Sequence, residues 1–120
     1  MDVRECAVLV VEDDADIREA ISELLHDEGY TVRGAENGAD ALAQLQHGYR
    51  PHLILLDLMM PVMDGWAFCD ESAKDATVAA IPIVVVSAVP DRTRPTRARA
   101  HLKKPIDFDN LLKTVKRLCA

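Results

Sequence analysis

Two kinds of hydrophobic pattern alternate along this chain. Short, nearly continuous apolar runs occur at Ala7–Val11, Leu53–Leu56 and Ile83–Val86, as expected for strands. The last two are apolar enough to be covered by helices on both faces. Between the runs, apolar residues recur every three or four positions, which is the spacing of one face of a helix. Strands that alternate with helices in this way predict βαβ units and a parallel sheet.

The expected elements follow one another without an internal repeat, a low-complexity tract or an evident linker. Two helices are predicted in the first half of the chain, one from about Ala15 to Asp27 and one around Ala41 to Leu45 that closes near Gly48. A third helix is predicted from a face shared by Trp66, Cys69 and Ala73. The last follows Asp107, and its apolar stripe consists of Phe108, Leu111, Leu112, Val115 and Cys119. A further strand is predicted at Tyr30–Ala35, and Pro82 is expected where a strand begins. These elements predict one doubly wound α/β domain over residues 1–120.

Polar side chains stand at the ends of three apolar runs. Glu12 and Asp13 follow the first run. Asp57 follows the second and Ser87 the third. Active groups of an open parallel α/β sheet gather at the carboxyl ends of its strands, so these side chains are expected to share one pocket. Three carboxylates so close together require positive charge, which Mg²⁺ and the basic side chain of Lys104 would supply.

Each of these groups alone has an ordinary structural interpretation. Asp13 or Glu12 would be an acid stabilised by the N-terminus of a helix. Ser87 would be a hydroxyl at the end of a strand, and Lys104 would be a solvated lysine. Asp64 is interpreted mainly as part of a turn that caps the following helix. The functional interpretation therefore depends on the groups occurring together and in order.

The ordered set resembles the receiver domain of response regulators in two-component signalling. The resemblance covers nearly the whole chain, and its landmarks are the acidic pair Glu12-Asp13, the turn DLMMPVMDG at Asp57–Gly65, Ser87, and Lys104-Pro105. It implies a flavodoxin-like sheet of five strands in the order 2-1-3-4-5, and a phosphoprotein that is not an enzyme. It also implies a histidine kinase or phosphotransfer protein as the phosphodonor in a phosphorelay, and a downstream protein or output domain as the next partner.

The resemblance also implies a role for each residue of the site. Asp57 would accept the phosphoryl group, and Lys104 would pair with one of its oxygens. Ser87 would donate its hydroxyl to another oxygen and pull its loop inward, which is the switch. The implied Mg²⁺ site consists of Glu12 acting through a metal-bound water, Asp13, Asp57 and the backbone carbonyl of Met59.

The segment between Ser87 and Lys104 departs from the family pattern. Only sixteen residues, 88–103, are available for a loop, the fourth helix, another loop and the fifth strand. Pro90 and Pro95 lack an N–H and disfavour helix in the residue before them. We therefore expect a fourth helix that is short or missing, starting near Pro95 and ending by Ala100.

The same segment concentrates positive charge and carries an unusual residue on the fifth strand. Its basic residues form either a solvated face or a docking patch for an acidic partner, and they are Arg92, Arg94, Arg97, Arg99, Lys103 and Lys104. His101 stands where the family has a Tyr or Phe, so the usual aromatic readout is not expected.

Composition limits the partners and the compartment. Fourteen basic and twenty acidic residues give a net charge of −6, which argues against nucleic acid and favours a protein partner. Cys6, Cys69 and Cys119 are widely spaced, which predicts neither a zinc site nor a disulfide framework. The charged N-terminus is not a secretory signal, and no apolar run approaches the roughly 20 residues that span a bilayer. A cytoplasmic protein that does not bind membranes is expected.

Two alternative functions are considered beside the phosphoacceptor. One is a receiver-like interaction module in which the shortened fourth helix prevents switching. The other is an aspartate-nucleophile phosphatase of the haloacid dehalogenase type, which uses similar groups. Such an enzyme needs a second acid two residues after the nucleophile, where this chain has Met59, and the chain lacks a cap domain. The phosphatase is therefore the less favoured alternative.

Overall fold

The protein forms a five-stranded parallel sheet in the order β2-β1-β3-β4-β5. The computed structural model describes residues 6–90, 95 and 97–119. The strands are β1 (Ala7–Val11), β2 (Thr31–Ala35), β3 (Leu53–Leu56), β4 (Ile83–Ser87) and β5 (Ala98–Lys103). The predicted doubly wound fold and strand order are confirmed, because β2 lies on one side of β1 as an edge strand, and the chain then continues on the other side of β1 through β3 and β4 to the edge strand β5.

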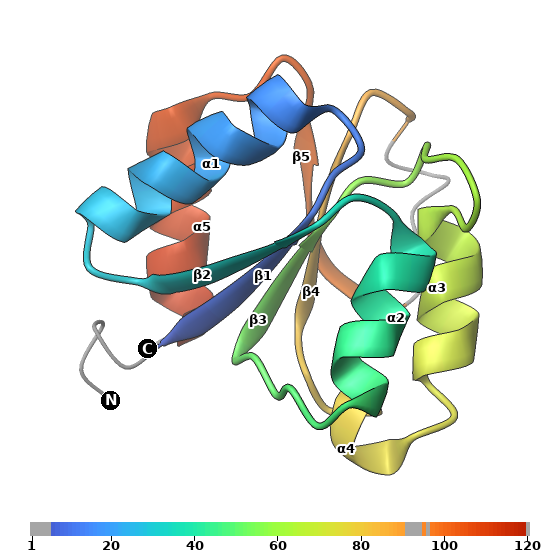
Figure 1. Cartoon of the computed structure of the whole chain (residues 1–120). Coiled ribbons are helices and arrows are strands. Elements are labelled where there is room, and N and C mark those ends of the chain that lie inside the picture. The colour runs from blue at the N-terminus through green and yellow to red at the C-terminus, as the bar shows by residue number, and fades with distance from the viewer. Residues whose placement is uncertain (1–5, 91–94, 96, 120) are drawn as a thin grey trace.

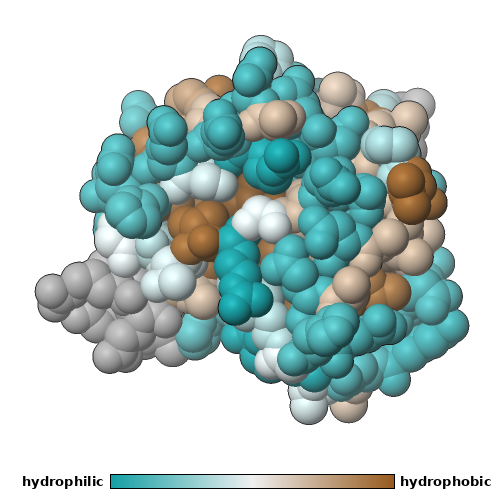
Figure 2. Space-filling view, viewed as in Figure 1, coloured by the Kyte–Doolittle hydropathy of each residue, from teal (hydrophilic) through white to brown (hydrophobic). Residues whose placement is uncertain are grey.

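Helices cover both faces of the sheet. Their bounds are α1 (Ala15–Asp27), α2 (Gly38–Gln46), α3 (Gly65–Ser72), α4 (Ala76–Ala79) and α5 (Phe108–Cys119). Helices α1 and α5 lie on one face, and α2 and α3 lie on the other (Figure 1). Among the residues described, no helix has the length and apolar character to span a membrane. On the side shown in Figure 2 the surface is mostly hydrophilic, and hydrophobic residues appear in small, separate patches.

The sheet separates two hydrophobic clusters. Residues of β1 alternate between them, because successive side chains of a strand point to opposite faces. Leu9 and Val11 face the cluster under α2 and α3. Val8 and Val10 face the cluster under α1 and α5. All four residues of β3 and all five of β4 are buried, as the continuous apolar runs predicted.

Aspartate or asparagine side chains begin four of the helices. Asp14, Asn37, Asp64 and Asp75 each accept a hydrogen bond from a backbone N–H in the first helical turn. The predicted capping role of Asp64 is confirmed. Two details of the helix predictions are wrong, because Ala73 lies at the exposed end of α3 and Phe108 at the start of α5 is 44% exposed. Both residues stand at helix ends, where the core no longer covers them.

The connection between β4 and β5 contains no helix in its described residues, which agrees with a short or missing fourth helix. Part of the connection, residues 91–94 and 96, lies outside the described residues. The expected limit of any such helix at Ala100 is tightened by the structure, because β5 already begins at Ala98. The single turn α4 precedes β4 instead and was not predicted. Four residues are too few to produce a recognisable helical period.

Arg97 has a structural role that the sequence did not reveal. Its guanidinium donates to the Cys69 carbonyl at 3.4 Å, the Ser72 hydroxyl at 2.5 Å and the Val78 carbonyl at 2.6 Å. These oxygens lie near the ends of α3 and α4, so the guanidinium ties the start of β5 to both helices. Arg97 is therefore not part of a docking patch, whereas Arg99 is exposed. Arg92 and Arg94 lie outside the described residues.

The cysteine prediction is also wrong. Cys6, just before β1, forms a disulfide with Cys119, the last residue of α5. The two residues are 113 positions apart in sequence, so spacing gave no signal, but the fold brings their Cα atoms to 6.1 Å. Cys69 is a buried free cysteine.

Candidate functional site

Three carboxylates meet at the carboxyl edge of the sheet. The β1–β3 register pairs Val11 with Leu56, so the residues that follow these two strands lie side by side. The Asp57 N–H donates to the Val11 carbonyl at 3.0 Å and fixes that register at the site. Carboxylate oxygens of Glu12, Asp13 and Asp57 lie within 4.8 Å of one another. Glu12 and Asp57 are buried, and Asp13 is exposed to solvent.

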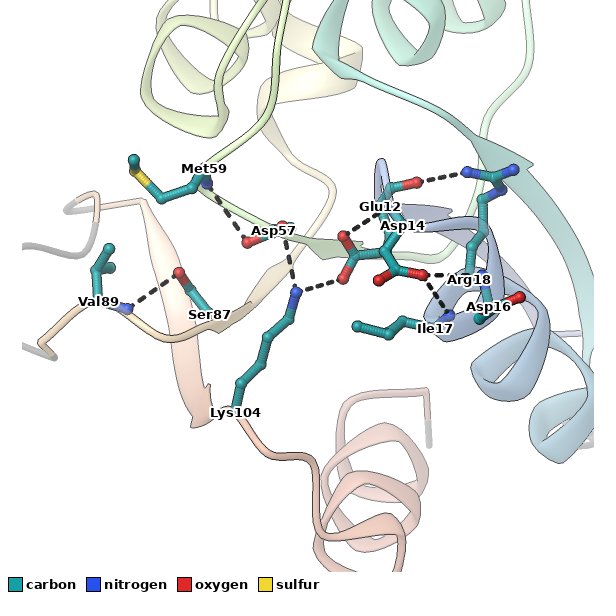
Figure 3. Close-up of polar contacts among 10 residues, drawn as sticks. All are labelled: Glu12, Asp14, Asp16, Ile17, Arg18, Asp57, Met59, Ser87, Val89 and Lys104. Carbon is teal, nitrogen blue, oxygen red and sulfur yellow. Dashed lines mark hydrogen bonds and ion pairs between the residues drawn. The ribbon is translucent and has the colours of Figure 1, made fainter.

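Lys104 reaches this cluster from the end of β5. Its Nζ lies 2.6 Å from Glu12 Oε1 and 3.3 Å from Asp57 Oδ2 (Figure 3). The Lys104 N–H donates to the Ser87 carbonyl at 3.1 Å and holds the end of β5 beside the end of β4. One cation therefore faces three carboxylates, and the cluster keeps an excess of negative charge.

The electrostatics of the cluster follow from burial. Burial raises the pKa of Glu12 to about 7, and the neighbouring Asp57 adds to this although Lys104 opposes it. Burial alone would lower the pKa of Lys104, but its hydrogen bond to Glu12 and the charge of Asp57 raise it above the usual value. Lys104 therefore stays protonated, and its positive charge remains available at the site.

The turn after Asp57 positions the Asp57 side chain. The Met59 N–H donates to Asp57 Oδ1 at 3.4 Å, while the Met59 side chain is 61% exposed. The Gly65 N–H donates to the Leu58 carbonyl at 2.9 Å and closes the turn. A Cβ at Gly65 would lie 2.7 Å from the Asp57 carbonyl, so only glycine allows α3 to begin so close to the strand.

Ser87 and His101 lie on the neighbouring strands. Ser87 is fully buried at the end of β4, and its hydroxyl accepts a hydrogen bond from the Val89 N–H at 3.3 Å (Figure 3). The hydrogen bond described for the Ser87 hydroxyl therefore lies within the loop that follows β4. His101 pairs with Val85 in the β4–β5 register, two positions before the pair of Ser87 and Lys103.

Two further residues that the sequence analysis missed support the acidic pair. Asp14 caps α1 by accepting from the N–H groups of Asp16 and Ile17. Arg18 donates to the Glu12 carbonyl at 2.7 Å and fixes the backbone at the end of β1. The capping role of Asp14 was readable, because an aspartate precedes a helical period. The contact of Arg18 depends on the path of the loop and gives no sequence signal.

The donor set of the cluster fits a divalent metal. Carboxylate oxygens are the ligands that Mg²⁺ prefers, and one or two protein carboxylates usually hold it with several waters. Exposed Asp13 and buried Asp57 offer such oxygens within one cluster. The excess negative charge at this edge would be reduced by the metal. The cluster could therefore hold Mg²⁺, with Glu12 nearby but already bound to Lys104.

Comparison with known proteins identifies the family. The sequence pattern of the response regulator receiver domain matches residues 8–116. The chain is 32% identical to Protein PilH of Pseudomonas aeruginosa over 94% of this chain and 97% of PilH. It is 33% identical to the transcriptional regulatory protein PdtaR of Mycobacterium tuberculosis, over 90% of this chain but 54% of PdtaR. It also spans about half, 52%, of the response regulator Rre1 of Synechocystis.

Solved structures agree with this assignment. The chemotaxis response regulator CheY4 of Vibrio cholerae superimposes with a TM-score of 0.85, at 32% identity, over 94% of this chain and 98% of CheY4. The receiver domain of the Francisella response regulator 1452 gives a TM-score of 0.86 at 25% identity, over 95% of this chain and 96% of that domain. The chain belongs to the response regulator receiver domains of two-component signalling, a family that typically lacks enzymatic activity of its own.

Proposed function

We propose that this receiver domain takes a phosphoryl group onto Asp57 from a histidine kinase or phosphotransfer protein, and that Mg²⁺ is required. The observation that carries the proposal is that Asp57 lies in one cluster with the other two carboxylates and 3.3 Å from the Lys104 Nζ. In the transfer, a carboxylate oxygen of Asp57 forms a bond to phosphorus while the bond from phosphorus to the donor nitrogen breaks. Such transfer depends mainly on positioning and on charge neutralisation, both of which this site supplies.

Each side chain of the site has one task in this reaction. Mg²⁺ bound at Asp13 and Asp57 would neutralise charge on the phosphoryl oxygens. Lys104, now paired with Glu12 and Asp57, would turn its ammonium to a phosphoryl oxygen. The Met59 N–H holds Asp57 Oδ1 in place. Ser87 would exchange its hydrogen bond with Val89 for one to the phosphoryl group, and its loop would move inward.

A hollow beside the site supports a protein as the phosphodonor. A cavity of about 320 Å³ lies between α1 and the start of α5, and its lining includes the apolar side chains of Ile17, Ala20, Ile106 and Phe108. Lys104 also lines it, so a partner seated there would lie next to Asp57. An exposed apolar hollow fits the side chains of a helix from a partner protein.

A small-molecule phosphodonor tests the proposal without the cognate kinase. Incubation with acetyl phosphate and Mg²⁺ should add one phosphate per chain, measured as intact mass, and removal of Mg²⁺ by chelation should prevent this. Asp13→Asn should lose most of the Mg²⁺-dependent labelling. The control Asp14→Asn keeps the helix cap, because asparagine caps as well as aspartate, and should label as the parent does. A folded parent that gains no phosphate, or gains it equally without Mg²⁺, contradicts the proposal.

One observation favours the alternative of a receiver-like module that does not switch. Arg97 fixes the start of β5 to α3 and α4, in the region where a switching loop would have to move. Trp66, the one tryptophan of the chain, packs against the cluster under α3 and can report such movement. A change in Trp66 fluorescence on phosphorylation, beyond that caused by Mg²⁺ alone, supports switching. Phosphorylation with unchanged fluorescence and unchanged amide exchange near Ser87 favours the non-switching module.

A further inference from the structure

We propose that Cys6 and Cys119 form a redox-modification site, a dithiol–disulfide pair that exchanges with a thiol–disulfide couple of the glutathione class. The fold alone brings the two residues together, since 113 positions separate them. Their Cα distance of 6.1 Å lies within the range for disulfides. Cys6 is fully buried and Cys119 is 7% exposed, and both belong to the hydrophobic cluster under α1 and α5.

The bridge joins the end of the last helix to the start of β1. Cys119 lies in the last turn of α5, and Cys6 directly precedes β1. Disulfides that close long loops are expected to stabilise strongly, because they remove many conformations from the unfolded chain. This bridge encloses nearly the whole domain. Its opening should therefore change the stability of the whole fold, besides freeing the end of α5.

The bridge and the phosphoacceptor site lie at opposite ends of the same strand. The five residues of β1, a length of roughly 16 Å, separate Cys6 from Glu12. None of the contacts between the carboxylates and Lys104 involves either cysteine. The redox state is thus an input to this receiver that is separate from phosphorylation.

A reversible role follows from the compartment, and this step rests on the proposed function. A histidine kinase takes its phosphoryl group from ATP, so a receiver that it phosphorylates is expected in the reducing cytosol. Disulfides are rare there, and those that form are usually transient and sense redox state. Cys119 is buried but lies in the last turn of α5, and fraying of that turn would expose its sulfur to exchange. Cys69 does not compete, because burial raises the pKa of its thiol to about 11.

The exchange balances with two glutathione molecules. One glutathione thiolate attacks the Cys119 sulfur, the disulfide breaks, and Cys6 leaves as a thiolate that takes up a proton. A second glutathione thiolate attacks the glutathione sulfur of the mixed disulfide and releases the Cys119 thiolate, which is also protonated. The products are two protein thiols and one glutathione disulfide, so the protein gains two electrons and two protons. The reverse sequence closes the bridge.

The test equilibrates the native chain in mixtures of reduced and oxidised glutathione, then denatures and alkylates it. The intact mass should show one label, on Cys69, when the bridge is closed and three labels when it is open. We expect the bridge to open in buffer dominated by reduced glutathione and to close again in oxidised glutathione. Opening should lower the melting temperature by about 10 °C. Cys6→Ser and Cys119→Ser should remove this redox dependence, while Cys69→Ala should keep it.

Three results would overturn the proposal: a bridge that stays closed in reduced glutathione while the protein is folded, a bridge that never forms in oxidised glutathione, or equal melting temperatures for both states. The measurement on the parent decides even if a serine variant fails to fold. Phosphate uptake at Asp57 is measured on both redox states in parallel. Loss of uptake in both states would count against the proposed function, whereas the labelling result concerns the cysteine pair alone.

Discussion

Lys104 and Arg97 are two partly buried cations, seven residues apart, whose surroundings differ. Lys104 binds two carboxylates in a cluster of three, so that its charge is insufficient to neutralise its neighbours. Arg97 binds two backbone carbonyls and one hydroxyl, all neutral oxygens at the ends of α3 and α4. The excess negative charge around Lys104 is expected at a site that binds a cation. The neutral oxygens around Arg97 are sufficient for a contact that only holds the structure together. We therefore expect Lys104 to serve function and Arg97 to serve stability.

The largest expected effect is that of removing the Lys104 charge. Lys104→Met leaves buried Glu12 and Asp57 without their cation, and the free energy of unfolding without Mg²⁺ should fall by about 3 kcal/mol at pH 8. Phosphate uptake should fall as well. The control Lys103→Met changes an exposed neighbour on the same strand and should alter neither quantity. Urea unfolding and intact mass measure the two effects, and equal behaviour of both variants would remove the distinction between Lys104 and a surface lysine.

Arg97→Ala should affect stability alone. It removes three hydrogen bonds to oxygens at the ends of α3 and α4, so the free energy of unfolding should fall by about 2 kcal/mol. Phosphate uptake by the folded fraction should match the parent. Arg99→Ala is the matched control, because Arg99 is exposed on the same strand. Equal stabilities of the two variants would show that the Arg97 contacts to α3 and α4 do not stabilise the fold.

The pH dependence of stability should report the raised pKa of Glu12, which burial causes in the first place. The folded protein holds a proton on Glu12 up to its pKa of about 7, whereas the unfolded chain releases it near 4.5. The folded state therefore binds more protons between these values, and this group makes stability fall as the pH rises from 4.5 to 7. Without Mg²⁺, Glu12→Gln should be more stable than the parent by about 1–3 kcal/mol at pH 8, with little difference near pH 4.5.

The control for this measurement is Glu19→Gln, which changes an exposed carboxylate on α1. Its stability difference from the parent should stay the same from pH 4.5 to 8. A Glu12→Gln variant that follows the same course as this control would show that the folded state does not hold the extra proton, and that the charges of the site are balanced without a metal.

The smallest expected effect concerns the lifetime of the phosphate. Met59 and Val89 flank the approach of water to Asp57 in the arrangement that the family resemblance implies, and neither side chain can orient water. Met59→Asn should speed phosphate loss several-fold without changing the fold, because the Met59 side chain is 61% exposed and contributes little to the core. A time course of intact mass compares the two proteins. If the parent loses phosphate as fast as Met59→Asn, water access is controlled elsewhere.

The parts of this protein that could be predicted from sequence are those that depend on local pattern. The apolar runs predicted the buried strands, and the helical period predicted α1 from Ala15 to Asp27, the bounds that the structure has. The polar residues at the strand ends predicted which side chains share one edge of the sheet, because parallel strands end together. The geometry now places Glu12, Asp13 and Asp57 in one cluster with Lys104.

The parts that could not be predicted depend on contacts between distant segments. The Cys6–Cys119 bridge joins residues at opposite ends of the chain, and Arg97 binds carbonyls 19 and 28 residues away. Neither leaves a periodic signal. The two prolines predicted a short or missing fourth helix, and the described residues between β4 and β5 contain none, but proline disfavours helix without indicating what other structure forms. Arg97 binds the ends of α3 and α4 there, whereas its position in a basic cluster had suggested either a solvated face or a docking patch.

The central claim is that Asp57 alone accepts the phosphoryl group. Asp57→Asn and Asp64→Asn change two aspartates of the same turn, and the second keeps its cap, because asparagine can also accept the hydrogen bond from the Ala67 N–H. Both proteins, with the parent, are incubated with acetyl phosphate and Mg²⁺, and the intact mass is measured. The account predicts one phosphate on the parent and on Asp64→Asn, and none on Asp57→Asn. Persistent phosphate on Asp57→Asn, or its loss from a folded Asp64→Asn, would contradict the account.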